Sequence, residues 1–260
     1  MIISHRHRFI FIKTEKTAGT SIELALARIC GPDDVISAVV HPADRALQKS
    51  LGPGYRAQQN DVIPLRYLTS LDMLQGIKRR RRPRFINHMG AADIRRFVPQ
   101  EVWRSYYKFC VERNPWDKAV SLYFWWKELE FQFRRDPPVF RRELGAAARG
   151  VEWMIVNHPI GDMSLSQFVQ SGRANLVQGY DLYTINGDIA VDRILRFERL
   201  EEDLAEVAQS LGIADLPSLP RAKANARRAG LHYRDQFDDA DRMKIARVFA
   251  REIALLGYEF

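Results

Sequence analysis

The sequence predicts an α/β fold in which a central, mainly parallel sheet is flanked by helices in three layers. Twice along the chain, a short apolar run is followed by a polar loop and then by a segment with a helical apolar face. The first unit is Phe9–Ile12 with the helix Ser21–Ile29, and the second is Trp103–Val111 with the helix Trp116–Leu129. With 260 residues, 46% of them hydrophobic, and no internal repeat, the simplest organisation is one domain spanning residues 1–260.

The remaining elements are predicted from turn and cap signals. Asn114 before Pro115 is typical of a helix start, and so is Ser164 before a short apolar segment. Asn186-Gly187 between two apolar arms predicts a hairpin. We also expect helices in Leu65–Gly76, Ser164–Gln170, Leu200–Leu211 and Asp238–Leu256, and strands at Phe85–His88 and Arg193–Phe197.

The charge balance favours an anionic partner. The chain has 40 Lys and Arg against 32 Asp and Glu, a formal net charge of +8, which suits a nucleotide, an acidic glycan, a nucleic acid or a membrane surface. The basic run Lys78–Arg84 either binds an acidic acceptor or an anionic membrane, or is a solvated loop. No apolar run reaches the length of a membrane span, so we expect a cytoplasmic protein, with peripheral membrane attachment left open.

Cysteine and histidine usage predicts neither a disulfide scaffold nor a metal site. The two cysteines are Cys30 and Cys110, and Cys110 lies in an apolar stretch typical of a buried thiol. No Cys/His cluster has metal-ligand spacing, so no metal is expected.

The loop Lys13–Ser21 has the composition of an anion site. Small residues between a strand and a helix allow several backbone N–H groups to face one anion at the helix N-terminus. Lys16 adds a mobile charge, and Thr20 and Ser21 add hydroxyls, although these two residues also suit plain N-capping. The loop resembles a nucleotide P-loop but lacks its leading glycine, and its lysine precedes Gly19, which disfavours ordinary ATP or GTP hydrolysis.

A second anion site is indicated where the next strand ends. Arg113 stands at the carboxyl end of that strand, where open α/β sheets bind ligands, and Ser121 lies about two helical turns further on. Both can converge on one phosphate, which a guanidinium holds with two parallel hydrogen bonds. The alternative is a local salt bridge for Arg113 and a serine bonded to its own helix.

Both segments resemble the cofactor signatures of the sulfotransferases, closest to the carbohydrate and bacterial branch. The matching stretches are KTEKTAGTSIE at Lys13–Glu23 and RNPWDKAVSLY at Arg113–Tyr123, and weaker likeness continues through Arg193–Leu204, Leu219–Arg228 and the terminal GYEF. The resemblance implies a P-loop-like fold and a metal-independent transfer of a sulfuryl group from 3′-phosphoadenosine 5′-phosphosulfate (PAPS) to an acceptor hydroxyl, leaving 3′,5′-ADP. It favours a carbohydrate or another small metabolite as acceptor.

The resemblance also assigns roles to residues. Lys16 would stabilise the bridging oxygen that leaves with the nucleotide, and His88 would be the general base, with His41 and Glu15 as rivals. The donor would be held at its 5′ end by Lys13, Thr17, Ala18, Gly19, Thr20 and Ser21, and at its 3′-phosphate by Arg113, Ser121, Arg227 and Arg228, with Lys223 nearby.

Two other functions fit parts of the sequence. An ATP- and Mg²⁺-dependent small-molecule kinase would use the same loop, but the displaced lysine argues against it. A nucleic-acid-binding module would use the arginine run and the tryptophans, but no base-reading motif is visible, so no specific nucleic acid is expected. The oligomeric state is open.

Overall fold

The computed structural model describes residues 1–38, 58–78, 82–145, 148–220 and 232–260, and the chain forms two compact units. Unit 1 comprises Met1–Val39, Ala46–Glu112 and Gly179–Pro220, and unit 2 comprises Val40–Arg45, Arg113–Gln178 and Arg221–Phe260. The organisation as one domain stays a prediction. Cys30 and Cys110 are both buried, as expected for Cys110.

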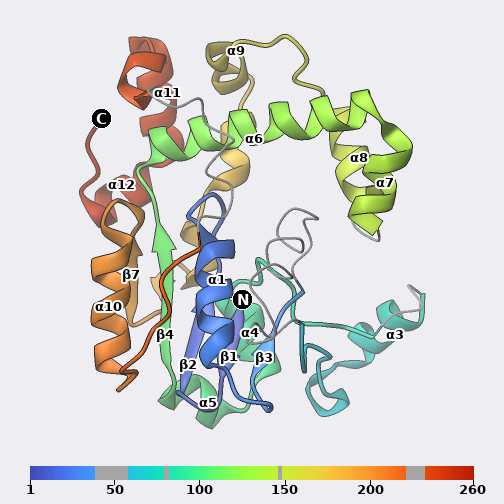
Figure 1. The fold of residues 1–260 in the computed structure, drawn as a ribbon, viewed down its shortest axis with the longest axis vertical. Coiled ribbons are helices and arrows are strands. Elements are labelled where there is room, and N and C mark those ends of the chain that lie inside the picture. The colour runs from blue at the N-terminus through green and yellow to red at the C-terminus, as the bar shows by residue number, and fades with distance from the viewer. Residues whose placement is uncertain (39–57, 79–81, 146–147, 221–231) are drawn as a thin grey trace. The chain divides into compact units, whose positions relative to one another are not determined.

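Unit 1 contains a five-stranded mixed sheet in the order β3-β1-β2-β4-β7 (Figure 1). β2 and β4 are parallel, as are β4 and β7, whereas β1 runs antiparallel to both β2 and β3. The fold is therefore α/β with helices flanking a central sheet, as predicted. The strands are β1 (Ile2–Ser4), β2 (Phe9–Ile12), β3 (Val35–Ile36), β4 (Tyr107–Glu112) and β7 (Arg193–Arg196).

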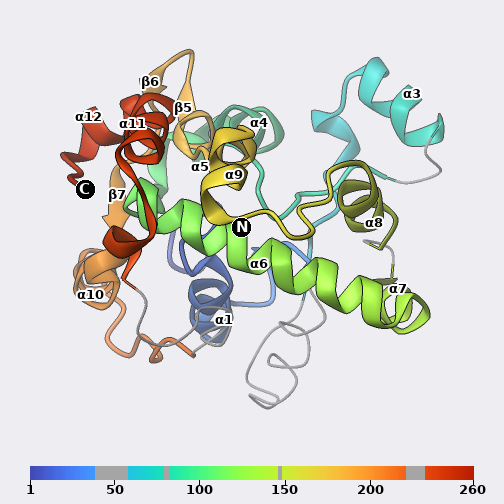
Figure 2. The ribbon, with the colours of Figure 1, turned by 90° about the horizontal axis from the view of Figure 1, so that it is seen from above.

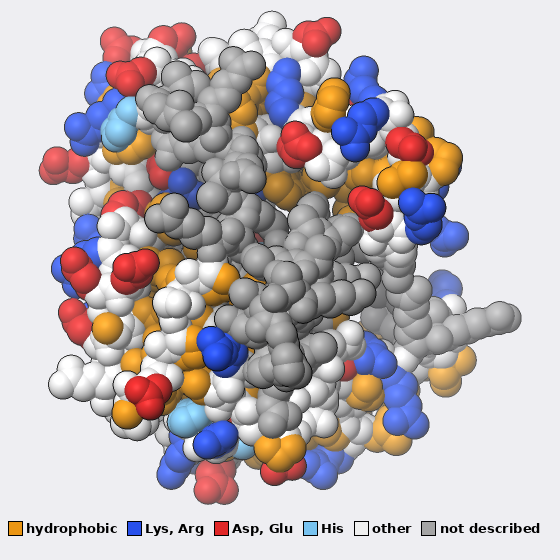
Figure 3. All heavy atoms as spheres, viewed as in Figure 1, with side chains coloured by type: hydrophobic (Ala, Val, Ile, Leu, Met, Phe, Trp, Pro, Cys, Tyr) orange, Lys and Arg blue, Asp and Glu red, His pale blue; other side chains and the backbone are white. Residues whose placement is uncertain are grey.

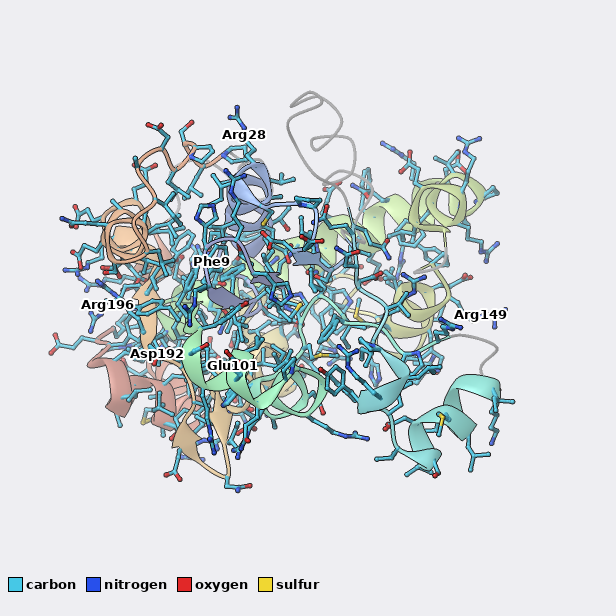
Figure 4. All side chains as sticks on the ribbon, turned by 90° about the horizontal axis from the view of Figure 1, so that it is seen from below. Phe9, Arg28, Glu101, Arg149, Asp192 and Arg196 are labelled. Carbon is cyan, nitrogen blue, oxygen red and sulfur yellow. The ribbon has the colours of Figure 1, made fainter. Side chains whose placement is uncertain are left out.

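Both faces of this sheet are covered, which explains why its strands are almost wholly apolar. Phe9 and Phe11 point to the face covered by α1 and α10, and Ile10 and Ile12 point to the face covered by α4. At the outer pair, Asp192, labelled in Figure 4, binds the backbone N–H of Lys108 at 2.7 Å and its ammonium at 2.9 Å, which joins β7 to β4. The helices of unit 1 are α1 (Gly19–Ile29), α3 (Ser70–Lys78), α4 (Ala91–Phe97), α5 (Gln100–Ser105) and α10 (Leu200–Ser210).

Three sequence signals are confirmed in detail. Asn186 has φ 55° and Gly187 φ 89°, the left-handed pair that a two-residue hairpin requires between β5 (Thr184–Ile185) and β6 (Asp188–Ile189). Asn114 caps the next helix by accepting from the N–H of Trp116 and Asp117. Ser164 forms a full capping box with Gln167.

Unit 2 is helical and is organised around one long helix (Figure 2). One apolar cluster joins α6 (Pro115–Arg135) to α9 (Leu165–Gln170), α11 (Asp239–Val248) and α12 (Ala250–Leu256). A second cluster joins the carboxyl-terminal half of α6 to α7 (Pro137–Leu144) and α8 (Ala148–Asn157). Short 3-10 helices occur in both units, at Leu65–Tyr67, Arg173–Val177, Tyr180–Leu182, Phe197–Arg199 and Tyr233–Gln236.

Three predicted elements differ from the structure. Phe85–His88 is not a strand, because the antiparallel pairing of the preceding residues with 61–63 ends at Phe85, whose N–H donates to the Asp61 carbonyl at 2.7 Å, and Asn87 and His88 then form a turn. The predicted strand Trp103–Val111 is divided between α5 and β4. The predicted closing helix Asp238–Leu256 is broken at Phe249, whose ring is fully buried.

Candidate functional site

The loop between β2 and α1 has an unusual backbone. Lys16 (φ 61°) and Ala18 (φ 59°) both adopt the left-handed region, with Thr17 between them. Non-glycine residues held there cost of the order of 1–3 kcal/mol each, and such strain gathers at functional sites. Left-handed residues at this spacing turn successive N–H groups to one side, which forms a concavity suited to an anion.

Helix α1 begins directly after this turn. Gly19, Thr20 and Ser21 form its first turn, which contains no acidic residue. The first N–H groups of a helix have no partner within it and carry the positive end of the helix dipole. The turn and the helix start therefore present donors to the same place, and a phosphate or sulfate group is the ligand that such donors bind.

Lys13 is fixed beneath this turn. Its ammonium lies 2.5 Å from Glu23 Oε2 and 3.3 Å from Thr20 Oγ1, and its side chain is almost fully buried. A Cβ at Gly19 would lie 2.6 Å from Lys13 Cγ, so the glycine leaves room for the lysine to cross it. Lys13 contacts Thr20, one of the residues expected to hold the donor.

Glu23 is the centre of a buried charge cluster. Burial alone would raise the pKa of Glu23, but the ammonium of Met1 and then that of Lys13 hold this pKa below its usual value. Glu23 also accepts a hydrogen bond from the Met1 ammonium. The carboxylate is thus ionised and holds Lys13 in its place.

Two threonines attach the loop to the neighbouring strand. Thr14 Oγ1 donates to the carbonyl of Val111 in β4 and lies 2.9 Å from Thr17 Oγ1. Thr17 Oγ1 donates in addition to the carbonyl of Thr14 at 3.2 Å. The loop therefore lies beside the carboxyl end of β4, and the Thr17 hydroxyl bonds within the loop itself.

His88 contacts the same loop from the turn before α4. Its Nδ1 lies 3.0 Å from the carbonyl oxygen of Lys13, and Asn87 Nδ2 lies 3.5 Å from its Nε2. A carbonyl only accepts hydrogen bonds, so Nδ1 carries the hydrogen in the neutral ring and Nε2 carries the lone pair.

Burial lowers the pKa of His88 from its ordinary value of 6.5. The charge of Glu15 opposes this shift and the charge of Lys13 adds to it. The imidazole is therefore neutral at neutral pH, the state that a general base requires. Glu15, a rival base in the sequence analysis, is close enough to act on His88 electrostatically.

The second motif lies in unit 2. Arg113 Nε donates to Asp117 Oδ2 at 2.8 Å and Nη2 lies 2.6 Å from the same oxygen, so this guanidinium is paired with a carboxylate in the first turn of α6. Ser121 is half-buried on α6. Asn114 holds the start of α6 through its cap and donates to the Glu259 carbonyl at 2.9 Å. Because the two motifs belong to different units, their convergence on one ligand stays a prediction.

Several predicted residues lie outside the described residues: His41, Arg79, Arg80, Arg81, Lys223, Arg227 and Arg228. Their roles stay predictions. Within the described ranges, no group of three or more His, Cys, Asp or Glu residues is arranged to hold a metal ion. No helix formed by the described residues combines the length and the apolar character needed to cross a bilayer.

Comparison with known proteins decides the family. A model of the sulfotransferase family matches residues 1–259, which is nearly the whole chain. The chain belongs to the sulfotransferase family. The resemblance stated from Lys13–Glu23 and Arg113–Tyr123 is confirmed.

This sulfotransferase is also similar to an uncharacterized protein of Archaeoglobus fulgidus. The two chains are 28% identical over 130 residues, which cover 49% of this chain and 85% of the archaeal protein. No solved structure matches the chain.

Three residues that shape the site in this sulfotransferase had no role in the sequence analysis. Glu23 pairs with Lys13, Asn87 approaches Nε2 of His88, and Asp117 pairs with Arg113. Two signals were present in the sequence. A carboxylate four residues after Arg113 on a helix predicts an ion pair, and Lys13 directly after an apolar strand needs a buried counter-charge.

Proposed function

We propose that this sulfotransferase moves a sulfuryl group from PAPS to the hydroxyl of a carbohydrate or another small metabolite, without a metal. The observation that carries the proposal is the strained turn at Lys16 and Ala18, which leads into the first turn of α1. In the reaction, a bond forms between the acceptor oxygen and sulfur while the bond from sulfur to the phosphate oxygen breaks. The electron pair leaves with the phosphate, and 3′,5′-ADP is released.

The 5′ end of the donor would be held by the loop and the helix start. Backbone N–H groups of Thr17, Ala18 and Gly19 and the hydroxyls of Thr20 and Ser21 supply hydrogen bonds to phosphate and sulfate oxygens. Lys13 would act one step away from the donor. Since its ammonium donates to Thr20 Oγ1, the hydrogen of that hydroxyl is directed elsewhere.

Lys16 would stabilise the leaving group. Negative charge develops on the bridging oxygen as the bond to sulfur breaks, and a positioned ammonium is worth most at that moment. Lys16 lies in the left-handed turn that leads directly into the first turn of α1, beside the proposed anion position. This assignment makes Lys16 a catalytic residue.

His88 would accept the proton of the acceptor hydroxyl at Nε2. The Lys13 carbonyl fixes the ring through Nδ1, and burial keeps the ring neutral. Because the same residue, Lys13, contacts both His88 and Thr20, the base and the donor site share one support. His41 and Glu15 remain the rival bases.

The 3′-phosphate would be bound by Arg113 and Ser121, helped by Arg227 and Arg228. Asp117 holds two nitrogens of the Arg113 guanidinium, which orients the planar group. β4 ends beside the Lys13–Ser21 loop, and Arg113 follows Glu112 directly in the chain. This connection supports placing both motifs on one nucleotide.

The face drawn in Figure 3 does not favour a nucleic-acid partner. On the face drawn in Figure 3, Lys and Arg side chains of the described residues are interspersed with Asp and Glu rather than gathered into one basic stripe. Such a stripe is the usual footprint of a nucleic-acid-binding protein.

Thermal unfolding with nucleotides tests the proposal. A ligand that binds only the folded state raises the melting temperature, by mass action. We expect 3′,5′-ADP in EDTA to raise the Tm of the full chain, and ATP with Mg²⁺ to raise it less. A shift by ATP that requires Mg²⁺, with none by 3′,5′-ADP, would favour the kinase instead.

A further inference from the structure

Helix α3 and the segment before it carry a cluster of exposed apolar side chains. Five of the thirteen large hydrophobic residues that are exposed in the described part of the chain lie between Leu65 and Ile77. None of the residues of α3 is buried. Leu71, Leu74 and Ile77 are 64%, 62% and 73% exposed, which is costly for aliphatic side chains unless another surface covers them.

These side chains form one face of the helix. At about 100° per residue, Leu71, Leu74 and Ile77 fall within an arc of about 120°. Lys78 follows Leu74 by one turn and lies within this arc, between Leu74 and Leu71. The aliphatic face of α3 thus includes a basic residue, whose long side chain can reach the polar headgroups while its stem lies among the apolar residues.

The polar side of α3 is joined to α4 within unit 1. Asp72 pairs with Arg96 of α4 and accepts from the N–H and the hydroxyl of Thr69 at 2.8 and 2.7 Å. Asp72 lies about 140° around the helix from Ile77 and about 160° from Leu74. The ion pair therefore turns the apolar face outward, and Figures 1 and 2 show α3 at the periphery of unit 1, apart from the sheet.

Basic residues adjoin this face. Lys78 ends α3, and Arg82 and Arg84 follow, both exposed. An aliphatic face beside positive charge is the combination that binds a membrane surface, because the side chains enter the headgroup boundary while the cations attract anionic lipid. A nucleic acid would instead be met by stacking aromatic rings, and the face has none.

We infer that α3 is a docking site for the surface of a bilayer containing anionic lipid, with Leu71, Leu74 and Ile77 inserted and Lys78 and Arg82 against the headgroups. With only nine residues in the helix, the attachment is reversible. It holds whether or not the proposed donor chemistry is correct, because it uses none of those residues.

Vesicle flotation of the full chain tests this docking site. We expect binding to vesicles of phosphatidylserine and phosphatidylcholine, and binding weaker by tenfold or more to phosphatidylcholine alone. The double variant Leu74→Ser with Ile77→Ser should reduce the partition coefficient by about tenfold or more. Lys78→Gln with Arg82→Gln should reduce the partition coefficient about 25-fold at low salt, at about fivefold per charge.

Leu176→Ser is the matched control, because Leu176 is 60% exposed and belongs to unit 2, so it is not part of the α3 face. It should bind vesicles like the wild type. Because all these substitutions are at exposed positions, the free energy of unfolding in urea should be the same for each variant as for the wild type.

Three results would overturn the inference. The first is no binding to phosphatidylserine vesicles, or equal binding without anionic lipid. The second is unchanged binding by the Leu74/Ile77 variant. The third is a wild-type dimer in analytical ultracentrifugation together with a monomeric Leu74/Ile77 variant. That result would mean that a second copy of the chain covers this face.

Discussion

Nδ1 of His88 lies 3.0 Å from the carbonyl oxygen of Lys13, the residue with which the proposed donor loop begins. The contact fixes the neutral ring with its lone pair on Nε2. Because the Lys13 ammonium also contacts Thr20, a shift of Lys13 would displace both the proposed base and a residue of the proposed anion site.

Replacing His88 should separate chemistry from binding. We expect His88→Ala to lower kcat for sulfuryl transfer by about 10²–10⁴, the usual contribution of a general base. Affinity for 3′,5′-ADP, measured by calorimetry, should change less than about threefold. If turnover persists, the base is Glu15 or His41, and the corresponding alanine variants would identify it.

The pH profile should report the lowered pKa of His88. The neutral ring is the active form, so kcat/KM should be constant above pH 6.5 and fall only when the pH drops through a lower value. The unfolded chain binds this proton more readily than the folded chain, so the stability contribution is also present above 6.5 and lost as the pH falls. An acid limb above pH 6.5 would contradict this assignment.

Lys16 should matter most in the transition state. We expect Lys16→Ala to reduce kcat by about 10²–10³, similar to the loss of one preorganised donor in other enzymes. Affinity for 3′,5′-ADP, which lacks the sulfuryl group, should fall less than about tenfold. Unchanged turnover would show that another group stabilises the leaving oxygen.

Glu23 should be a structural requirement of the site. Glu23→Gln removes the charge that balances Lys13 in a buried position, which we expect to cost about 3–5 kcal/mol in the free energy of unfolding. Urea denaturation measures it, with Glu201→Gln, an exposed carboxylate on α10, as the control. A loss below about 1 kcal/mol would mean that Lys13 does not depend on this partner.

Local signals predicted the parts of the fold that depend on neighbouring residues. The cap at Asn114, the hairpin at Asn186-Gly187 and the apolar strand Phe9–Ile12 each follow from a few adjacent side chains. The motif at Lys13–Glu23 likewise predicted a strand, a turn and a helix start, and the family it implied is the one found.

The errors lie where tertiary packing decides. Phe85–His88 resembles a strand in sequence, but its backbone pairing with Asp61 ends at Phe85 and the chain turns at Asn87 and His88. The strand Ile2–Ser4 was missed because the charged residues after it hide a three-residue apolar run. The pairing of Lys13 with Glu23 appears only when α1 packs beside β2, so spacing alone did not reveal it.

Calorimetric titration of 3′,5′-ADP and of 5′-AMP, which lacks the 3′-phosphate, tests the central claim most directly, namely that one nucleotide is held by both motifs. We predict that the wild type prefers 3′,5′-ADP in the absence of metal, and that Arg113→Ala loses about 2–5 kcal/mol of binding free energy for 3′,5′-ADP but little for 5′-AMP. An equal loss for both ligands, or none for either, would contradict the claim.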